Sequence, residues 1–507
     1  MNALQLLERH LAARPEASAF IDGERRVSYR EFDALCRSAA AWLAGQGIGP
    51  GERVALWLVN RLEWLALLFG AARLGAAVVA INTRYRAAEL THILERSGAR
   101  LLVMQPTFRG IDFAAVLREV KPVERVAVLD ADPFAGSRHA PPERSAPEAI
   151  VAMFTTSGTT QGPKLVMHPQ RSVAFHARQV ARSFGFEAPG ARLLAAMPFC
   201  GVYGFTAAMG ALAGGAPIVL METFDAAAAV ALVRRHAVTH LFGSDEMYRR
   251  MLELAPGHDP FPSARVFGYA AFNPGAAELA REAWAKRVPL FGLYGSSEVH
   301  ALFSIQDADA PLESRIEAGG RPAAGALAQV RIRDVETGEL LPPERSGEIE
   351  IRSPGNFAGY WNDVAASAEA MHADGFFRTG DIGRLREDGS FVYETRKGDA
   401  MRLAGYLVSP LEIEDALKDL AGVTDVQVVA VEISGRARCV AFVIPGAPAP
   451  READLLAAAS RRMAAFKVPA RVWFVDGFPS TQSANGVKIQ RGKLREMAAE
   501  RLRATPA

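Results

Sequence analysis

The sequence predicts an α/β protein, in which a large N-terminal domain of α/β layers with a β subregion precedes a small α+β C-terminal domain. Three observations predict it. Short apolar runs alternate with helical patterns up to about residue 293, an order typical of mainly parallel sheet. From 328 to 393, short β runs lie between Gly and Pro turns. A polar, glycine-containing junction follows at 396–399, which predicts domains over 1–396 and 397–507.

Local signals predict the elements of the first half in order. Ser28 and Glu31 form a capping-box pattern that opens an Ala- and Leu-rich helix to about Ala44. The other predicted helices are 62–74 and 89–96, and the predicted strands are 53–59, 77–81, 101–104, 126–129 and 149–154. The segment 130–147 is rich in Pro, Ala and charge, and is predicted to be a surface loop.

The second half changes character after the α/β alternation. The β subregion contains strand patterns at 347–352 and 389–393. Beyond the junction, an amphipathic helix is predicted at 410–420, with strands at 426–431 and 439–444. The chain therefore divides into two unequal parts.

Composition and charge exclude several classes of protein. The 507 residues include 58 Lys and Arg against 56 Asp and Glu, a formal charge of +2, which argues against a basic field for nucleic acid. Three distant cysteines permit no disulfide framework or CxxC metal pair. The charged start lacks a signal-peptide pattern, and Arg73 interrupts the most apolar stretch, 64–81. We therefore expect a cytoplasmic protein without an integral membrane segment.

The strongest local signal is the run from Phe154 to Lys164, which is dense in Thr, Ser and Gly. Its hydroxyl and N–H groups can wrap a phosphate chain, and Lys164 adds a positive charge. It is not a Walker A loop, because Pro163 intervenes and Leu165 stands where Ser or Thr is required. A flexible surface loop is the alternative, but the position after a predicted strand favours phosphate binding.

This loop resembles the phosphate loop of the acyl-adenylate-forming (AMP-binding) superfamily, which includes acyl-CoA synthetases, adenylation domains and luciferases. Further blocks resemble that family in the family's order, and together they cover nearly the whole chain: Tyr-Gly-Ser-Ser-Glu at 294–298, the block at 347–361, Arg-Thr-Gly-Asp at 378–381, Arg-Lys-Gly-Asp at 396–399, Pro-Leu-Glu-Ile-Glu at 410–414 and the lysine block at 479–489. The resemblance implies an acyl-CoA synthetase, most like a fatty-acid or an aryl- or alicyclic-acid CoA ligase, that uses ATP, Mg²⁺ and coenzyme A.

Carried over residue by residue, the resemblance implies a nucleotide site made of the phosphate loop and three later blocks. Its residues are Thr156, Ser157, Gly158, Thr159, Thr160, Lys164, Tyr294, Gly295, Ser297, Asp381 and Arg396. A tyrosine can stack on adenine, Asp381 can accept both ribose hydroxyls, and Glu298 can hold Mg²⁺. The alternatives for isolated motifs are a strand-end turn, an Asp turn and, for Arg396, a salt bridge at the domain junction.

Lys488 is implied as the catalytic residue of the first step, together with Glu298 and Lys164. A carboxylate that attacks the α-phosphate brings two anions together, and a lysine at that point neutralises the developing charge. The alternative for this segment is a basic, solvated tail helix.

The family resemblance also implies a small C-terminal domain that swings between two chemical steps. It places the hinge at Gly398 and Asp399, where relatives usually carry Asp or Lys at the first position. Gly405 would then face the pantetheine tunnel for coenzyme A.

The acyl pocket is expected among Gly, Ala and aromatic residues with almost no charge. Its expected residues are Phe199, Gly201, Tyr203, Gly204, Ala270, Ala271 and Gly292. Gly201 stands where many relatives carry His, which leaves room in the pocket. Cys200 is expected to be a buried thiol rather than a nucleophile. These features favour a hydrophobic monocarboxylic acid, aliphatic, alicyclic or aromatic.

Two other functions stay open at this point. A stand-alone adenylating enzyme would load the acyl group on a carrier-protein phosphopantetheine, but no carrier domain is fused to the chain. A catalytically degenerate nucleotide-binding homologue is disfavoured because all the implied lysines and carboxylates are present. The chain could act as a monomer or a homodimer.

Overall fold

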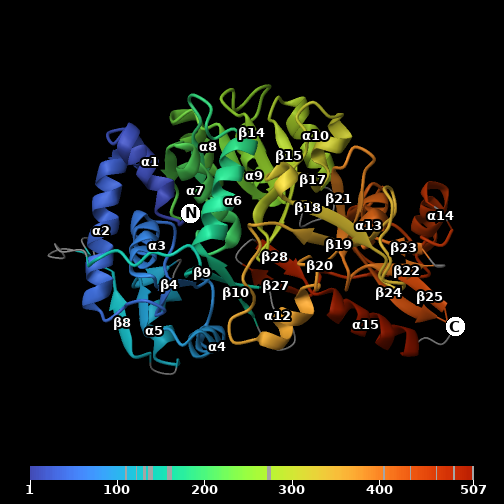
Figure 1. The fold of residues 1–507 in the computed structure, drawn as a ribbon. Coiled ribbons are helices and arrows are strands. Elements are labelled where there is room, and N and C mark those ends of the chain that lie inside the picture. Colours follow the sequence, from blue (N-terminus) through green and yellow to red (C-terminus); the bar gives the residue numbers. More distant parts are fainter. Residues whose placement is uncertain are drawn as a thin grey trace.

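The computed structural model describes residues 1–108, 111–120, 123–129, 133–134, 141–156, 163–270, 276–403, 406–433, 436–463, 465–483 and 486–504. The α/β class is confirmed, with a large N-terminal part and a small C-terminal part. In Figure 1 the blue-to-green half of the chain and the orange-to-red end lie at opposite sides of the molecule. No helix among these residues is long and apolar enough to cross a bilayer.

A mainly parallel sheet forms the first layer. Within the described residues its strands follow the order β10-β9-β4-β3-β5-β8, with bounds Leu165–Pro169, Ile150–Thr155, Ala77–Ala80, Arg53–Trp57, Leu101–Met104 and Arg125–Val128. Only β10 pairs antiparallel, with β9. The predicted strands are therefore confirmed to within a residue or two at their ends.

Helices cover this sheet as the sequence predicts. Helix α2 (Tyr29–Gly45) begins with the predicted capping box, in which the Ser28 hydroxyl accepts from the Glu31 N–H. Helix α3 (Leu62–Leu74) matches its predicted bounds and is almost wholly buried. The most apolar stretch of the chain is thus a core helix that leads into β4. The other helices of this part are α1 (Gln5–Ala13), α4 (Ala87–Ser97), α5 (Phe113–Leu117) and α6 (Gln170–Ser183).

A second, longer sheet joins the α/β layers to the β subregion. Thirteen strands within the described ranges follow the order β18-β19-β20-β21-β17-β16-β15-β14-β13-β11-β12-β1-β2. The stretch from β12 to β15 is parallel, and β15 pairs antiparallel with β16. Bounds along the chain are β1 (Ser18–Asp22), β2 (Arg25–Ser28), β11 (Leu193–Ala195), β12 (Ile218–Leu220), β13 (His240–Ser244), β14 (Val266–Ala270), β15 (Leu290–Ser296), β16 (His300–Ile305) and β17 (Gly319–Pro322).

Four helices of this second layer connect its parallel strands: α7 (Val202–Gly214), α8 (Ala226–Arg235), α9 (Asp245–Leu254) and α10 (Ala276–Ala285). A fifth, α11 (Leu312–Ile316), lies between the antiparallel strands β16 and β17. Helix α7 is buried along its whole length, because it lies between this sheet and the core of the first layer. The strand ends that carry the expected site residues therefore rest on a rigid, apolar interior.

The predicted β subregion is present, and its strands pair antiparallel. They are β18 (Gln329–Arg333), β19 (Gly347–Arg352), β20 (Phe377–Leu385) and β21 (Phe391–Arg396), with helix α12 (Val364–Ala370) between β19 and β20. Strand β21 begins at Phe391 rather than Gly389 and runs to Arg396. This shift places Arg396 in the sheet, where it pairs with Asp381.

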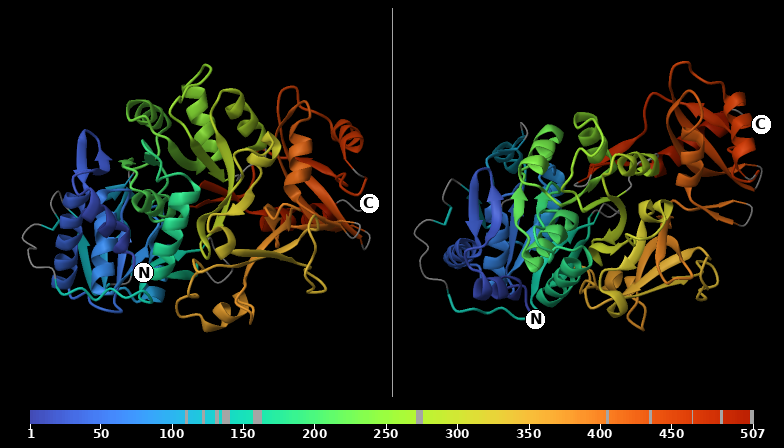
Figure 2. Two further views of the ribbon diagram at one scale, coloured as in Figure 1. Left: turned by 45° about the horizontal axis from the view of Figure 1, so that its top comes forward. Right: turned by 90° about the horizontal axis from the view of Figure 1, so that it is seen from above.

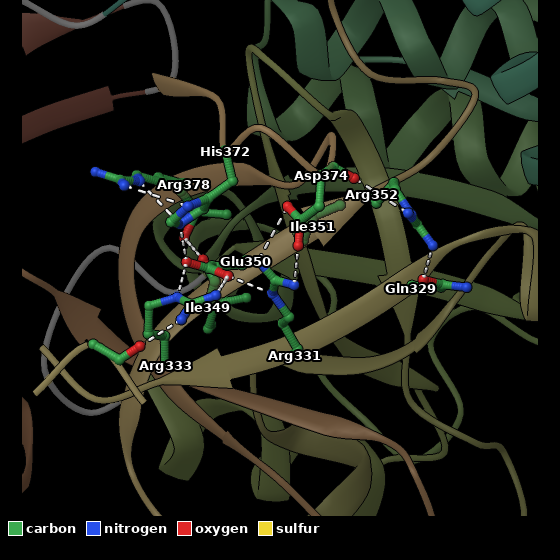
Figure 3. A network of polar contacts seen from close by, with 12 residues as sticks. Gln329, Arg331, Arg333, Ile349, Glu350, Ile351, Arg352, His372, Asp374 and Arg378 are labelled. Carbon is green, nitrogen blue, oxygen red and sulfur yellow. Dashed lines mark hydrogen bonds and ion pairs between the residues drawn. The ribbon is translucent and has the colours of Figure 1, made fainter. Parts of the chain in front are cut away.

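A buried carboxylate ties these strands together. Glu350 on β19 is fully buried and accepts hydrogen bonds from Arg331 Nε (2.5 Å) and Arg333 Nε (2.7 Å) on β18, and it also contacts His372 (Figure 3). Burial alone would raise the pKa of Glu350, but the hydrogen bonds from Arg333 and Arg331 outweigh it and lower that pKa. The network fixes the strand that adjoins the Asp381 strand.

The C-terminal residues form a separate lobe (Figure 2). Its elements are β22 (Met401–Leu403), β23 (Tyr406–Val408), α13 (Pro410–Lys418), β24 (Val423–Ile433), β25 (Arg436–Pro445), α14 (Glu452–Arg462), β26 (Val472–Phe474), β27 (Ser480–Ser483), β28 (Gly486–Ile489) and α15 (Arg491–Ala504). Strands β24, β25 and β26 form a sheet with its own apolar core. The predicted helix and both predicted strands of this part are confirmed.

Candidate active site

The base of the predicted phosphate loop is closed by backbone contacts between its two ends. Thr156 N–H donates to the Lys164 carbonyl (3.0 Å), and Lys164 N–H donates to the Thr156 hydroxyl (3.1 Å). These bonds extend the β9–β10 hairpin to the loop, so that Thr156 and Lys164 lie together. Ser157, Gly158, Thr159 and Thr160 of the same prediction lie outside the described residues.

Glu298 lies on a tight turn between β15 and β16. A Cβ at Gly295 would lie 2.6 Å from the Ala301 Cα and the His300 carbonyl oxygen, so this close approach requires glycine. Ser297 and Glu298 follow, both half-buried. The turn therefore presents a carboxylate at the end of a central strand.

Tyr360 connects Glu298 to Lys164. Its hydroxyl donates to Glu298 Oε1 (3.0 Å), and Lys164 Nζ lies 4.8 Å from the centre of its ring. Burial and the Glu298 charge both raise the pKa of Tyr360, which keeps the phenol protonated as a donor. This tyrosine lies in the block at 347–361, for which the sequence motifs predict no role of their own.

Asp381 lies at the centre of a second polar cluster. Tyr294 OH donates to Asp381 Oδ2 (2.6 Å), and Arg396 Nη1 lies 2.8 Å from Asp381 Oδ1. Asp381 is 2% exposed, and its own N–H donates to the Thr379 hydroxyl. Burial raises the pKa of Asp381, while Arg396 and Tyr294 oppose that change. Three predicted nucleotide-binding residues are thus in direct contact.

The Tyr294 ring is held by other aromatic rings. It packs edge-on against Phe391 at 5.3 Å and Phe303 at 6.4 Å, and lies 5.8 Å from Tyr393. The tyrosine is 6% exposed. Its orientation is therefore fixed before any ligand arrives.

The predicted hinge lies where β21 ends. Gly398 is exposed, and its carbonyl accepts a hydrogen bond from Arg495 Nη1 on α15 (3.0 Å). Asp399 N–H donates to the Arg396 carbonyl (2.9 Å), and the Asp399 carboxylate lies 3.8 Å from Arg495. Gly405, the predicted tunnel residue, lies outside the described residues.

Lys488 lies on β28, of which the structure gives the backbone. Strands β27 and β28 pair antiparallel, with Thr481 opposite Lys488. Lys488 is thus on a strand, and the basic helix α15 begins only at Arg491, where a bidentate pair with the buried Glu414 (2.7 and 2.6 Å) anchors it. In Figures 1 and 2 the hairpin extends from the C-terminal lobe towards the middle of the larger part.

The residues expected in the acyl pocket surround the start of helix α7. Phe199 is fully buried, and its N–H donates to Asn60 Oδ1 (2.7 Å). Tyr203 OH donates to the Gly268 carbonyl (3.2 Å), which ties α7 to β14. A Cβ at Gly204 would lie 2.3 Å from the Met197 carbonyl oxygen, so α7 packs tightly there.

The other expected pocket positions are more scattered. Gly201 caps the N-terminus of α7, and Ala270 ends β14 and is half-buried. A Cβ at Gly292 would lie 2.0 Å from the Glu317 carbonyl oxygen, so that glycine permits close packing near α11. Ala271 lies outside the described residues. Cys200 is buried as expected, and burial raises the pKa of its thiol to about 11.

The donor set of this site fits a magnesium ion bound with phosphates. Mg²⁺ prefers hard oxygen ligands and is usually held by one or two carboxylates together with phosphate oxygens and water. The half-buried Glu298 offers one such carboxylate beside the phosphate loop. No group of three or more His, Cys, Asp or Glu suited to a metal occurs among the described residues.

Comparison with known proteins agrees with this geometry. Residues 7–361 match the AMP-binding enzyme family, and residues 412–485 match the AMP-binding enzyme C-terminal domain. The chain is 31% identical to 3-hydroxybenzoate–CoA ligase of Aromatoleum sp. (strain CIB), over 97% of this chain and 95% of that protein. It is also 31% identical to ScoC, a fatty acid–acyl-carrier-protein ligase of Streptomyces coeruleorubidus, over 97% and 96% of the two chains.

Among solved structures, ATP-bound MatB from Rhodopseudomonas palustris superposes with a TM-score of 0.85 and 27% identity, over 98% of this chain and 99% of that chain. The family match spans both parts of the molecule, and the sequence relatives span nearly the whole chain. The chain therefore belongs to the AMP-binding enzyme family, as an ATP-dependent acyl-CoA synthetase that uses Mg²⁺ and coenzyme A.

Proposed function

We propose that this enzyme activates a hydrophobic monocarboxylic acid, and that its ATP site is formed by the two polar clusters described above. The single observation that supports the ATP site best is the contact of Tyr294, Asp381 and Arg396. In this proposal Asp381 accepts the ribose hydroxyls and Tyr294 stacks on the adenine. Arg396, whose side chain is 52% exposed, keeps donors free for the ribose or phosphates.

The phosphates lie between the loop and the Glu298 turn in this proposal. Thr156, the loop residues 157–160 and Lys164 bind them through N–H groups, hydroxyls and one positive charge. Glu298 is the metal ligand, and Tyr360 orients its carboxylate through the 3.0 Å hydrogen bond. When bound, Mg²⁺ neutralises phosphate charge.

Lys488 serves the first chemical step. A carboxylate oxygen of the acid forms a bond to the α-phosphorus while the bond to pyrophosphate breaks, which leaves an acyl-AMP. The Lys488 ammonium reduces the repulsion between the two anions and stabilises the charge that develops. In the second step the coenzyme A sulfur attacks the acyl carbon, AMP leaves, and the thiol proton goes to solvent.

The domains proposed for this cycle are 1–396 and 397–507, with a hinge at Gly398 and Asp399. Of the strands before Met401, all but the short pair β6 (Thr107–Phe108) and β7 (Ile111–Asp112) belong to the two large sheets. The strands from Met401 onward pair only with one another within the described residues. Rotation at the hinge would withdraw the Lys488 hairpin and bring the segment around Gly405 to the site, as a pantetheine tunnel.

The acid in this proposal is an aryl, alicyclic or aliphatic monocarboxylic acid. The segments around Phe199, Tyr203 and Ala270 are apolar and aromatic. A second charged group on the acid would therefore be buried there without a partner, which costs free energy. The sequence relatives act, by their names, on 3-hydroxybenzoate and on fatty acids, which share a hydrophobic body and one carboxylate.

The acceptor in this proposal is free coenzyme A, and the enzyme acts in the cytoplasm. A homodimer is the assembly to be tested. A panel of carboxylic acids, assayed for pyrophosphate release and for thioester formation, tests the substrate class. Hydrophobic monocarboxylates should give the highest kcat/KM, and preference for dicarboxylic or amino acids would contradict the proposal. The same assay with a holo carrier protein in place of coenzyme A tests the acceptor, and light scattering gives the assembly.

A further inference from the structure

Three buried histidines form a stack behind the Glu298 turn. They come from three elements: His168 from β10, His176 from α6 and His300 from the start of β16. The ring centres of His168 and His300 lie 4.0 Å apart, and those of His176 and His300 lie 4.8 Å apart at an angle of 12°. All three side chains are at most 3% exposed.

Two of these histidines hold the backbone of the turn on either side of Glu298. His168 Nε2 lies 2.8 Å from the Ser297 carbonyl oxygen, and His176 Nε2 lies 2.9 Å from the Ala301 carbonyl oxygen. A carbonyl oxygen only accepts, so each Nε2 carries the proton and each tautomer is fixed. The bond from His168 ends one residue before Glu298.

The turn needs such support because its backbone is unusual. His300 has a φ of 65° and Leu302 has a φ of 55°, in the left-handed region that non-glycine residues rarely adopt. Such conformations persist where surrounding contacts determine them, and they concentrate at functional sites. The histidine stack supplies contacts of this kind.

We propose that His168 is a positioning residue for Glu298, and that it couples the phosphate loop to the proposed metal ligand. Lys164 and His168 lie on the same hairpin, because β10 begins at Leu165 directly after the loop. A rigid connection then runs from the loop through β10 and the His168 imidazole to the Ser297 carbonyl and Glu298. This inference rests on the role of Glu298 in the proposed function.

Two further contacts hold Glu298 from other directions. Phe357 N–H donates to the Glu298 carbonyl (2.8 Å), and Tyr360 OH donates to its carboxylate. Both come from the 357–360 segment, which itself pairs with β10, since Met167 N–H donates to the Gly359 carbonyl (3.0 Å). The His168 contact comes from β10 itself. The His168 bond therefore holds the backbone of the Glu298 turn directly against the strand that follows the phosphate loop, whereas the other two contacts act through the 357–360 segment.

The test separates loss of the hydrogen-bond donor at residue 168 from loss of its aromatic ring. His168→Phe keeps the stack and loses the hydrogen bond, and His168→Gln offers an amide donor near the Nε2 position. His176→Phe is the matched control, because it makes the same change in the same stack at the Ala301 carbonyl. Each full-length variant is assayed for acyl-AMP formation, for thioester formation from supplied acyl-AMP, and by calorimetry of ATP binding with and without Mg²⁺.

His168→Phe should reduce kcat/KM for acyl-AMP formation by about tenfold, a loss typical of partners that orient metal ligands. It should weaken ATP binding with Mg²⁺ and leave ATP binding without Mg²⁺ unchanged. The second half-reaction should be unaffected, His168→Gln should recover most of the loss, and His176→Phe should stay near wild type.

A double-mutant cycle separates positioning from core packing. If His168 acts through Glu298, His168→Phe should cost less than about twofold in a Glu298→Gln background. Three outcomes would overturn the proposal. They are the same cost of His168→Phe in the wild-type and Glu298→Gln backgrounds, the same loss in both half-reactions, and a loss in His176→Phe as large as that in His168→Phe. If His168→Phe does not fold, His168→Asn, whose amide is too short to reach Ser297, takes its place. A Glu298→Gln variant with wild-type Mg²⁺ dependence would instead contradict the proposed role of Glu298.

Discussion

The polar cluster around Asp381, which is proposed to bind ATP, and the hairpin that carries Lys488 are built in opposite ways. Asp381 is 2% exposed, lies inside a large sheet, and already contacts Tyr294 and Arg396. The hairpin consists of two short strands that pair only with each other among the described residues. The groups proposed to bind the nucleotide are thus organised in advance, whereas the proposed catalytic charge lies on an element with few contacts to the site.

Histidine content distinguishes residues 1–396 from the C-terminal part. All ten histidines lie before residue 397, and of the nine that the structure describes five are buried: His10, His168, His176, His240 and His300. The C-terminal part has none. The two parts should therefore respond differently to acid as well as to substitution.

Replacing Lys488 should give the largest effect and should separate the two half-reactions. Lys488→Ala should reduce acyl-AMP formation by about 10²–10³-fold, the loss typical of removing one preorganised stabilising group. Thioester formation from supplied acyl-AMP should change little, because the hairpin is proposed to leave for that step. Pyrophosphate release and thioester formation are measured separately. Lys493→Ala, an exposed lysine on the following helix, is the control, and equal losses in both variants would count against the assignment.

Replacing Asp381 tests the preorganised side of the comparison. Asp381→Asn removes the charge that pairs with Arg396 and weakens acceptance of the ribose hydroxyls. We expect ATP affinity to fall by about tenfold to a hundredfold, since a hydrogen bond to a charged group contributes about 1.5–3 kcal/mol. Calorimetry with ATP measures this. Asp388→Asn, on an exposed turn of the same β subregion, should bind ATP normally.

Removing the Tyr360 hydroxyl should have a smaller effect. Tyr360→Phe keeps the ring under Lys164 and loses the 3.0 Å bond to Glu298, so the carboxylate gains freedom. A loss of about threefold to tenfold in kcat/KM for ATP is expected, in line with about 1 kcal/mol for one hydrogen bond. Tyr360→Leu, which also removes the ring, should lose more. Equal kinetics in wild type and Tyr360→Phe would exclude an orienting role.

Mild acid should weaken the histidine-rich part first. Burial lowers the pKa of His240 from 6.5 to about 4, so between these values the unfolded chain binds a proton that the folded chain does not. The free energy of unfolding therefore falls as pH decreases from 6.5 towards 4, by about 1.4 kcal/mol per pH unit for each such histidine. Hydrogen exchange at pH 7 and pH 5, corrected for the intrinsic exchange rate at each pH, should show that the frequency of opening increases in residues 1–396. Earlier opening of the C-terminal lobe would refute this contrast.

Local patterns predicted much of the fold, because their physical causes are local. The capping box at Ser28 and Glu31 and the apolar helix Leu62–Leu74 depend on side chains a few residues apart, and both are present. Strand ends were predicted less accurately: the strand predicted at 389–393 is β21, which runs from Phe391 to Arg396. Pairing with neighbouring strands sets where a strand ends, and a single sequence does not show which strands are neighbours.

The sequence likewise predicted some residues of the candidate site and missed others. Tyr294, Asp381 and Arg396 stand in recognisable motifs, so the sequence predicted them as partners in one site, although not their direct contact. Tyr360 and His168 were missed because their roles come from distant contacts, with Glu298 and Ser297. The aromatic residue in the 359–361 block was the available signal for Tyr360, whereas a lone histidine in an apolar strand predicts only a core residue.

The exposed glycine at the proposed hinge has a consequence for protein engineering. A Cβ built on Gly398 has no heavy atom within 4 Å, so larger residues fit at this position in the conformation described. Any energetic effect of such a residue would arise mainly in the alternative arrangement of the lobes. If the hinge acts as proposed, a small substitution library at this one position would adjust the relative lifetimes of the two proposed arrangements, and with them the balance between activation and transfer.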